Sequence, residues 1–229
     1  MIKNYSGDIM NFGMAQDMAE MEGIQVESVV VKDDVAVPDS TYSTGRRGIA
    51  GTMFVHKIAG AMAETGAPLS EVAGVAREVV ANLRSMGMAM SPCILPAVGR
   101  PGFTLGENEI EIGMGIHGEP GVEKTTMKTA KEIAEILLQK ILDDYDYSGS
   151  EVAVLVNGLG GTPLVELYIL NYEVQKLLKE KNITAYKTLV GNYTTSLEMT
   201  GCSLSLLKLD DKLKKLLDAS CDTPAYKVD

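Results

Sequence analysis

The chain has 229 residues, of which 45% are hydrophobic and 23% charged, the balance of a globular protein that can form a core. Its net charge of −10 and its low aromatic content, with no tryptophan, argue against nucleic acid and anionic membranes as partners. Three scattered cysteines and two histidines, without a Cys-x-x-Cys or His-Glu-x-x-His motif, favour neither a disulfide framework nor a transition-metal site.

The first half of the chain predicts mainly helices. Asp8 stands where a helix N-cap belongs, and methionines recur at helical spacing after it, which predicts a helix over residues 9–22 whose methionine stripe fills a core. Gly23 ends this helix, and the β-branched residues 24–31 predict a strand. The other elements expected here are a loop over residues 33–48 and helices over residues 49–64 and 70–85.

Prolines interrupt the middle of the chain. Residues 86–106 contain three of them and predict an irregular segment, so we expect a domain boundary near Met90 that separates residues 1–90 from residues 91–229. Residues 4–8 resemble the end of a strand with almost nothing before it. We therefore expect that an upstream part of the fold is absent from this chain.

The second half alternates between strand and helix patterns, which predicts α/β layers with a largely parallel sheet. Residues 151–157 form a continuous apolar run, typical of a strand buried on both faces. The strands expected are residues 109–116, 151–157, 185–192 and 203–209, and the helices are residues 125–144, 163–181 and 210–219. No apolar run is long enough to span a membrane and the first residues do not resemble a signal peptide, so we expect a cytoplasmic protein.

His117 is the most informative candidate for chemistry. It follows an alternating strand and opens a His-Gly-Glu-Pro-Gly turn, and α/β folds place reactive groups at strand ends. Gly115 and Gly118 leave room for a ligand beside the imidazole. The pattern alone favours a hydrogen-bonded turn histidine that has no ligand.

The other candidates have structural alternatives that spacing alone favours. His56 lies inside a predicted helix and is expected to be a packed or surface residue. Asp8 is either a helix cap or a carboxylate that holds a substrate hydroxyl, and Lys3 could donate to the same ligand. Residues 158–162 are glycine-rich and could hold an anion, but they lack the P-loop and Gly-x-Gly-x-x-Gly patterns, which favours a tight structural turn.

Four segments of the chain, in order, resemble the dihydroxyacetone kinase family, most closely its dihydroxyacetone-binding K subunit. They are KNYSGDIMNF at residues 3–12, GRRGIAGT at 45–52, GMGIHGEPG at 113–121 and VNGLGGTP at 156–163. The resemblance spans essentially the whole chain. It implies two α/β domains of the K-subunit type, the first incomplete at its N-terminus, because the family's upstream glycine-rich loop with a second catalytic histidine does not occur in this sequence.

The resemblance also implies a mechanism. His117 would bind the ketone covalently as a hemiaminal, which suits a neutral imidazole near pH 7 and rejects glycerol because glycerol has no carbonyl group. Asp8 would bond the substrate hydroxyl and assist its activation, and Lys3 would bind substrate. The product would be dihydroxyacetone phosphate.

The partners implied by the resemblance carry the phosphoryl chemistry. No cofactor is expected in this chain; ADP or ATP with magnesium would be bound by a nucleotide-binding L subunit. The phosphoryl group would come from phosphoenolpyruvate, with a phosphotransferase-system M subunit acting indirectly, or from free ATP. A homodimer is expected. Two alternatives remain: a non-catalytic paralogue that senses dihydroxyacetone and coactivates a regulatory partner, and a general nucleotide-binding α/β domain that uses residues 158–162.

Overall fold

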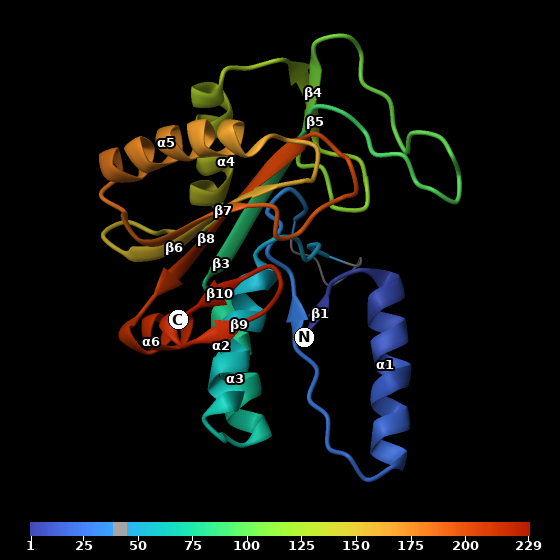
Figure 1. Ribbon diagram of the computed structural model, residues 1–229, viewed down its shortest axis with the longest axis vertical. Coiled ribbons are helices and arrows are strands. Elements are labelled where there is room, and N and C mark those ends of the chain that lie inside the picture. Colours follow the sequence, from blue (N-terminus) through green and yellow to red (C-terminus); the bar gives the residue numbers. More distant parts are fainter. Residues whose placement is uncertain (39–44) are drawn as a thin grey trace.

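A six-stranded sheet lies at the centre of the computed structural model, which describes residues 1–38 and 45–229 (Figure 1). Its strand order is β5-β4-β3-β8-β6-β7. These strands are β3 (Leu83–Ala89), β4 (Glu109–Ile112), β5 (Glu123–Thr126), β6 (Glu151–Gly158), β7 (Thr184–Gly191) and β8 (Gly201–Leu209). The α/β class predicted from the sequence is confirmed.

The direction of the strands differs from the prediction of a largely parallel sheet. β6 and β7 are parallel, whereas β8 runs antiparallel to both β3 and β6, and β4 runs antiparallel to β3 and β5. The parallel expectation fails at two places: β8 enters the sheet antiparallel between β3 and β6, and β4 is antiparallel to its neighbours β3 and β5. The alternation of strands and helices along the chain does not reveal that insertion.

Helices cover both faces of this sheet (Figure 1). One face packs against α4 (Ala130–Asp144) and α5 (Leu164–Glu180); the other packs against α2 (Thr52–Glu64), α3 (Leu69–Ala81) and α6 (Asp211–Asp218). Within β6, Val154 faces the first helical layer and Leu155 the second, and both are fully buried. The strand is therefore apolar throughout because both faces are covered, as its sequence predicts.

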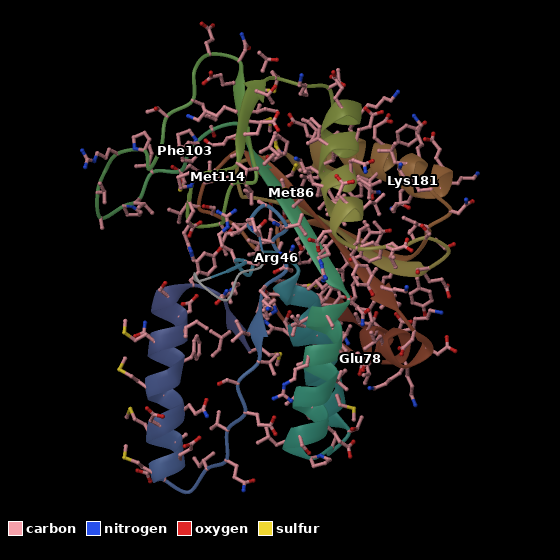
Figure 2. The ribbon with its side chains drawn as sticks, turned by 180° about the vertical axis from the view of Figure 1, so that it is seen from behind. Arg46, Glu78, Met86, Phe103, Met114 and Lys181 are labelled. Carbon is pink, nitrogen blue, oxygen red and sulfur yellow. The ribbon has the colours of Figure 1, made fainter. Side chains whose placement is uncertain are left out.

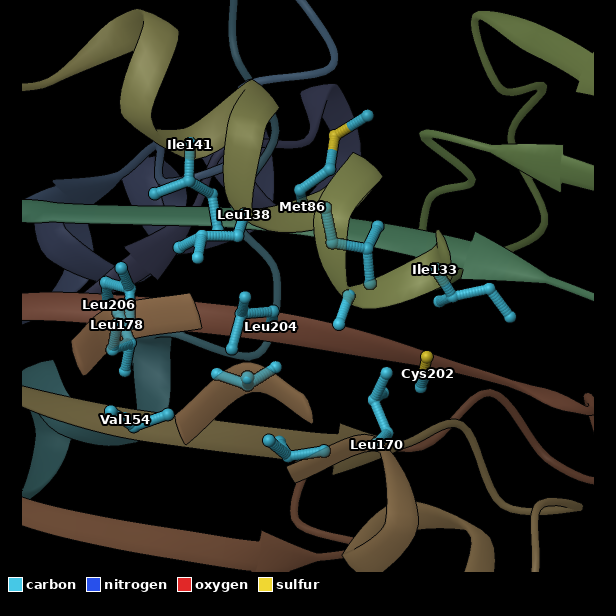
Figure 3. Packing of buried hydrophobic residues seen from close by; sticks show 14 of the residues in the cluster. Met86, Ile133, Leu138, Ile141, Val154, Leu170, Leu178, Cys202, Leu204 and Leu206 are labelled. Atoms are coloured by element: carbon cyan, nitrogen blue, oxygen red, sulfur yellow. The ribbon is translucent and has the colours of Figure 1, made fainter. Parts of the chain in front are cut away.

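Figure 3 shows the core between the sheet and the α4–α5 layer. Met86 of β3, Leu204 of β8 and Leu138 of α4 all belong to this core, and each is at most 1% exposed. α4 begins at a capping box in which the Thr129 hydroxyl accepts from the Glu132 amide while the Glu132 carboxylate accepts from the Thr129 amide. This cap fixes where the helix starts and explains why it begins later than the predicted residue 125.

Helix α1 (Ser6–Met21) stands apart from the three layers, beside a two-stranded parallel sheet of β1 (Ile2–Lys3) and β2 (Val30–Val31) (Figure 1). The helix is predicted correctly, but two details of the prediction are wrong. Its N-cap is Tyr5, so Asp8 lies in the first turn. Its methionine stripe does not fill a core: the exposures are 63% for Met10, 53% for Met14, 64% for Met18 and 80% for Met21, and sulfur atoms line the outer side of the helix in Figure 2.

Two further boundaries differ from the predictions. The helix expected to reach Ser85 ends at Ala81, and residues from Leu83 form β3. The strand expected over residues 24–31 is reduced to Val30–Val31. The loop expected over residues 33–48 lies partly outside the described residues. The chain ends in a short hairpin of β9 (Cys221–Asp222) and β10 (Lys227–Val228).

The domain boundary near Met90 stays a prediction. β3 ends at Ala89 and is paired on one side with β4 and on the other with β8. In the described part of the chain, no helix combines the length and the apolar character that crossing a bilayer would require.

Candidate functional site

The turn that carries His117 joins the antiparallel strands β4 and β5 and is braced at both ends. At its start, the Gly113 amide donates to the Gly87 carbonyl at 2.7 Å. At its end, the Gly121 amide donates to the Glu111 carboxylate, also at 2.7 Å. The sharp turn predicted for residues 117–121 lies earlier, at residues 115–118, where the Gly118 amide donates to the Gly115 carbonyl at 3.2 Å.

A buried arginine attaches this turn to the segment before α2. Arg47 donates through Nη2 to the Gly113 carbonyl at 2.6 Å and through Nε to the Asp34 carboxylate at 2.8 Å. Asp34 is fully buried, and burial raises its pKa to about 6 although the Arg47 charge acts in the opposite direction. The guanidinium thus links the GRRG segment to the histidine turn.

The His117 side chain is 57% exposed and is held on two sides. Its Nδ1 lies 3.1 Å from Glu119 Oε1, and its ring meets the Tyr5 ring edge-on with the centroids 4.4 Å apart. The hydrogen bond to Glu119 raises the pKa of His117, partial burial opposes this, and the Glu119 charge adds to it. The Asp8 charge also raises this pKa, and the Lys3 charge lowers it.

Three of the sequence segments meet around this imidazole. Tyr5 touches the His117 ring, and the neighbouring Asn4 side chain donates to the Arg46 carbonyl at 2.7 Å. Arg47 then donates to the carbonyl of Gly113. Lys3 on β1 and Asp8 in the first turn of α1 are therefore brought into electrostatic range of His117, although they are more than a hundred positions away in sequence. Their roles stay predictions.

His56 shares Lys3 as a neighbour with His117 but lines a cavity that His117 does not line. It is on the exposed side of α2 and lines a cavity of about 620 Å³, together with Lys57, Tyr193 and Tyr226. Partial desolvation lowers the pKa of His56, and the nearby positive charge of Lys3 acts in the same direction. His117 is not among the residues that line this cavity. Of the two alternatives expected for His56, a packed or a surface residue, the structure shows the surface residue.

The glycine-rich segment at residues 158–162 is a tightly packed turn. Gly160 has φ +121°, and a Cβ placed there would lie 1.9 Å from the Leu197 carbonyl oxygen. The Thr162 hydroxyl donates to the Gly201 carbonyl at 2.7 Å and accepts from the Gly201 amide at 2.8 Å. Backbone of the segment before β8 therefore covers this loop, which confirms the structural interpretation.

Sequence reasoning missed the roles of Tyr5, Arg47 and Glu119 around His117. The signal for Glu119 is local, because a carboxylate two positions after a histidine in a glycine-bounded turn can fold back onto the ring. Arg47 carries a weaker signal as the second residue of an arginine pair. Tyr5 has none, since its contact depends on how α1 is placed against the turn.

The chain belongs to the Dak1 domain family, which it matches over residues 1–225. It is 50% identical over 227 residues to the dihydroxyacetone-binding subunit of PTS-dependent dihydroxyacetone kinase 1 from Listeria innocua serovar 6a, a match that covers 98% of this chain and 69% of that protein.

Two solved structures show the same fold. A dihydroxyacetone kinase operon co-activator superposes with a TM-score of 0.89 at 34% identity, over 96% of this chain and 68% of the other. The dihydroxyacetone kinase of C. freundii superposes with a TM-score of 0.83 at 33% identity, over 99% of this chain and 41% of the other. The family resemblance noted from the four sequence segments is confirmed.

Proposed function

We propose that this chain is the dihydroxyacetone-binding subunit of a dihydroxyacetone kinase and holds the ketone as a hemiaminal on His117. The observation that carries the proposal is the imidazole itself. It is more than half exposed, and its Nδ1 is hydrogen-bonded to Glu119. It also lies in electrostatic range of the Asp8 carboxylate and the Lys3 ammonium group. The names of the relatives support the choice of ligand.

The covalent step uses the ring nitrogen that Glu119 does not occupy. The Nε2 lone pair forms a bond to C2 of dihydroxyacetone, the carbonyl π pair moves to the oxygen, and that oxygen takes a proton from a water molecule. The transient ring cation faces the Glu119 carboxylate. Its Nδ1 proton then passes through Glu119 to the hydroxide that the water left, so the hemiaminal is neutral and water is regenerated. Glycerol has no carbonyl carbon to attack and is excluded by its chemistry, whereas packing alone discriminates weakly between such small molecules.

Asp8 and Lys3 would act on the hydroxyl groups of the bound ketone. Asp8 accepts a hydrogen bond from the hydroxyl that is to be phosphorylated and makes its oxygen more nucleophilic. Lys3 donates to a substrate oxygen. Phosphorylation then needs a separate L subunit that binds ADP or ATP with magnesium, with a phosphotransferase-system M subunit as the indirect phosphoryl source. We expect the assembly to be cytoplasmic, with this chain as a homodimer.

The test is native mass spectrometry of the chain with dihydroxyacetone or glycerol. Wild type should gain the mass of one dihydroxyacetone and no glycerol, and His117→Ala should gain neither. His56→Ala is the matched control, because it removes an imidazole that lines a cavity without His117, and it should retain the adduct. An adduct that persists in His117→Ala, or a wild type that never gains one, would refute the proposal.

A second candidate is a dihydroxyacetone sensor without kinase activity. The close superposition on an operon co-activator favours it. A coupled assay with a nucleotide-binding L subunit and its phosphoryl donor separates the two functions. A kinase subunit forms dihydroxyacetone phosphate, whereas a sensor binds the ketone without turnover.

A further inference from the structure

Glu119 contacts His117 through both carboxylate oxygens. Oε1 lies 3.1 Å from the ring Nδ1, and Oε2 accepts from the His117 backbone amide, also at 3.1 Å. One carboxylate therefore fixes the backbone and the side chain of the same residue. Such a two-point contact restricts the ring orientation more than a single hydrogen bond would.

The chemistry of this pair determines which ring nitrogen carries the proton. An ionised carboxylate can only accept hydrogen bonds, so the neutral His117 ring must donate from Nδ1. The hydrogen bonds from His117 lower the pKa of Glu119, although burial opposes them, which keeps Glu119 ionised at neutral pH. The Nε2 lone pair is then free.

We propose that Glu119 is a positioning residue that holds His117 in the Nδ1–H tautomer and thereby leaves Nε2 as the nucleophile. The inference rests on the proposed function in one respect, that His117 attacks the ketone. Imidazole side chains in water prefer the opposite tautomer, with the proton on Nε2, so the effect is measurable in the absence of any ligand.

The surroundings of Glu119 are built to keep it in this place. A Cβ at position 115 would lie 2.1 Å from Glu119 Oε2 and 2.8 Å from Arg47 Nη1, so only glycine leaves space for the carboxylate. The His117 ring also contacts the Tyr5 ring. Burial and the Glu119 charge raise the pKa of the Tyr5 hydroxyl, so Tyr5 stays neutral. Gly115, Arg47 and Tyr5 therefore restrict the conformations that the Glu119 and His117 side chains can adopt.

The charged groups that act on the imidazole come from two elements besides its own turn. Lys3 belongs to β1 and Asp8 to α1, and their charges affect the pKa of His117 in opposite directions. Glu119 provides the largest influence, through its hydrogen bond to the ring Nδ1. Its replacement is therefore expected to lower the pKa of His117 while Lys3 and Asp8 remain in place.

The decisive experiment is a long-range ¹⁵N–¹H correlation spectrum of the ¹⁵N-labelled chain without ketone, recorded across a pH series. His56→Asn identifies the signals of His117, the one other histidine of the chain. In wild type above its pKa, His117 should show the proton on Nδ1. In Glu119→Gln the population should move toward Nε2–H, and the titration midpoint should move to lower pH.

Glu111→Gln is the matched control, because Glu111 braces the same turn through the Gly121 amide rather than through the imidazole. It should leave both the tautomer and the midpoint unchanged. Gly115→Ala should reproduce the Glu119→Gln result, since it removes the space for the carboxylate. An Nε2–H tautomer in wild type, or an unchanged spectrum in Glu119→Gln, would overturn the proposal.

The adduct assay adds a second measurement. Glu119→Gln should weaken dihydroxyacetone binding roughly 10- to 100-fold, the range found when a histidine loses the partner of its other ring nitrogen in metal sites. If wild type forms no adduct, the proposed function fails, whereas the tautomer measurement still tests the role of Glu119.

Discussion

Replacing Arg47 with methionine tests the buried arginine that connects the histidine turn to the rest of the chain. The substitution removes the partner of Asp34, which is fully buried, and leaves the Gly113 carbonyl without its 2.6 Å donor. Leaving one member of a buried ion pair unpaired costs about 3–5 kcal/mol. We expect a loss of this size in the free energy of unfolding at pH 8.

The loss should depend on pH because Asp34 titrates. Its pKa in the folded protein is about 6, above the ordinary 3.8, so the folded protein holds this proton more tightly than the unfolded chain. The resulting stabilisation is complete below pH ~4 and is lost as the pH rises through ~6. Without Arg47 this pKa rises further. Above pH 6, the free energy of unfolding of the variant therefore decreases relative to that of wild type by up to ~1.4 kcal/mol per pH unit. At pH 5, where Asp34 is largely protonated in both proteins, only the hydrogen bonds of Arg47 are lost, about 1–3 kcal/mol.

Urea unfolding followed by circular dichroism at pH 5 and pH 8 measures the loss of unfolding free energy at each pH. Arg46→Met is the control, because Asp144 would keep its ion pair with Arg84. The double variant Asp34→Asn, Arg47→Met should recover part of the loss, since no buried charge remains. The reasoning is wrong if Arg47→Met costs under about 1 kcal/mol at pH 8, or if its cost is the same at both pH values.

Two further substitutions test local geometry by the same unfolding assay. Gly160→Ala should destabilise the protein by at least about 1–3 kcal/mol, because alanine is strained at φ +121° and its Cβ would overlap the Leu197 carbonyl. The control is Gly74→Ala on α3, where an added Cβ meets no atom within 4 Å. This control should stabilise the protein by about 0.5–1 kcal/mol. Equal effects of the two alanines would contradict the packed-turn interpretation. Thr129→Ala removes the cap of α4 and should cost about 1 kcal/mol; no measurable loss would mean that the Glu132 carboxylate caps the helix alone.

The sequence predicts the elements whose signal is local. α4 and α5 follow from apolar periodicity, β6 follows from an unbroken apolar run, and Asp210 caps α6 where the predicted helix begins. β3 is missed because Leu83–Ala89 contains an arginine and a glycine directly after a helix. Its strand conformation is imposed by pairing with β8, which is distant in sequence.

In the candidate site too, the sequence predicts the features that have a local signal and misses those that depend on tertiary contacts. His117 is found because its turn has a distinctive local pattern, and the packed nature of residues 158–162 is predicted from the absence of a phosphate-binding motif. The methionine stripe of α1 is misjudged because helical spacing shows which residues share a face but not what that face contacts. The bracing of the turn by Arg47 depends on tertiary structure and has no equivalent in sequence spacing.

The central position of β3 has a consequence for how the protein is made. β3 pairs along its whole length with β8, from Leu83 with Leu207 to Ala89 with Gly201. A ribosome delivers the two strands more than a hundred residues apart, so β3, with the apolar Met86 and Met88, emerges long before its pairing partner β8 is synthesised. Because such distant pairings slow folding and leave apolar strands exposed in the meantime, the nascent chain should need chaperone protection until the last strand of the sheet is complete.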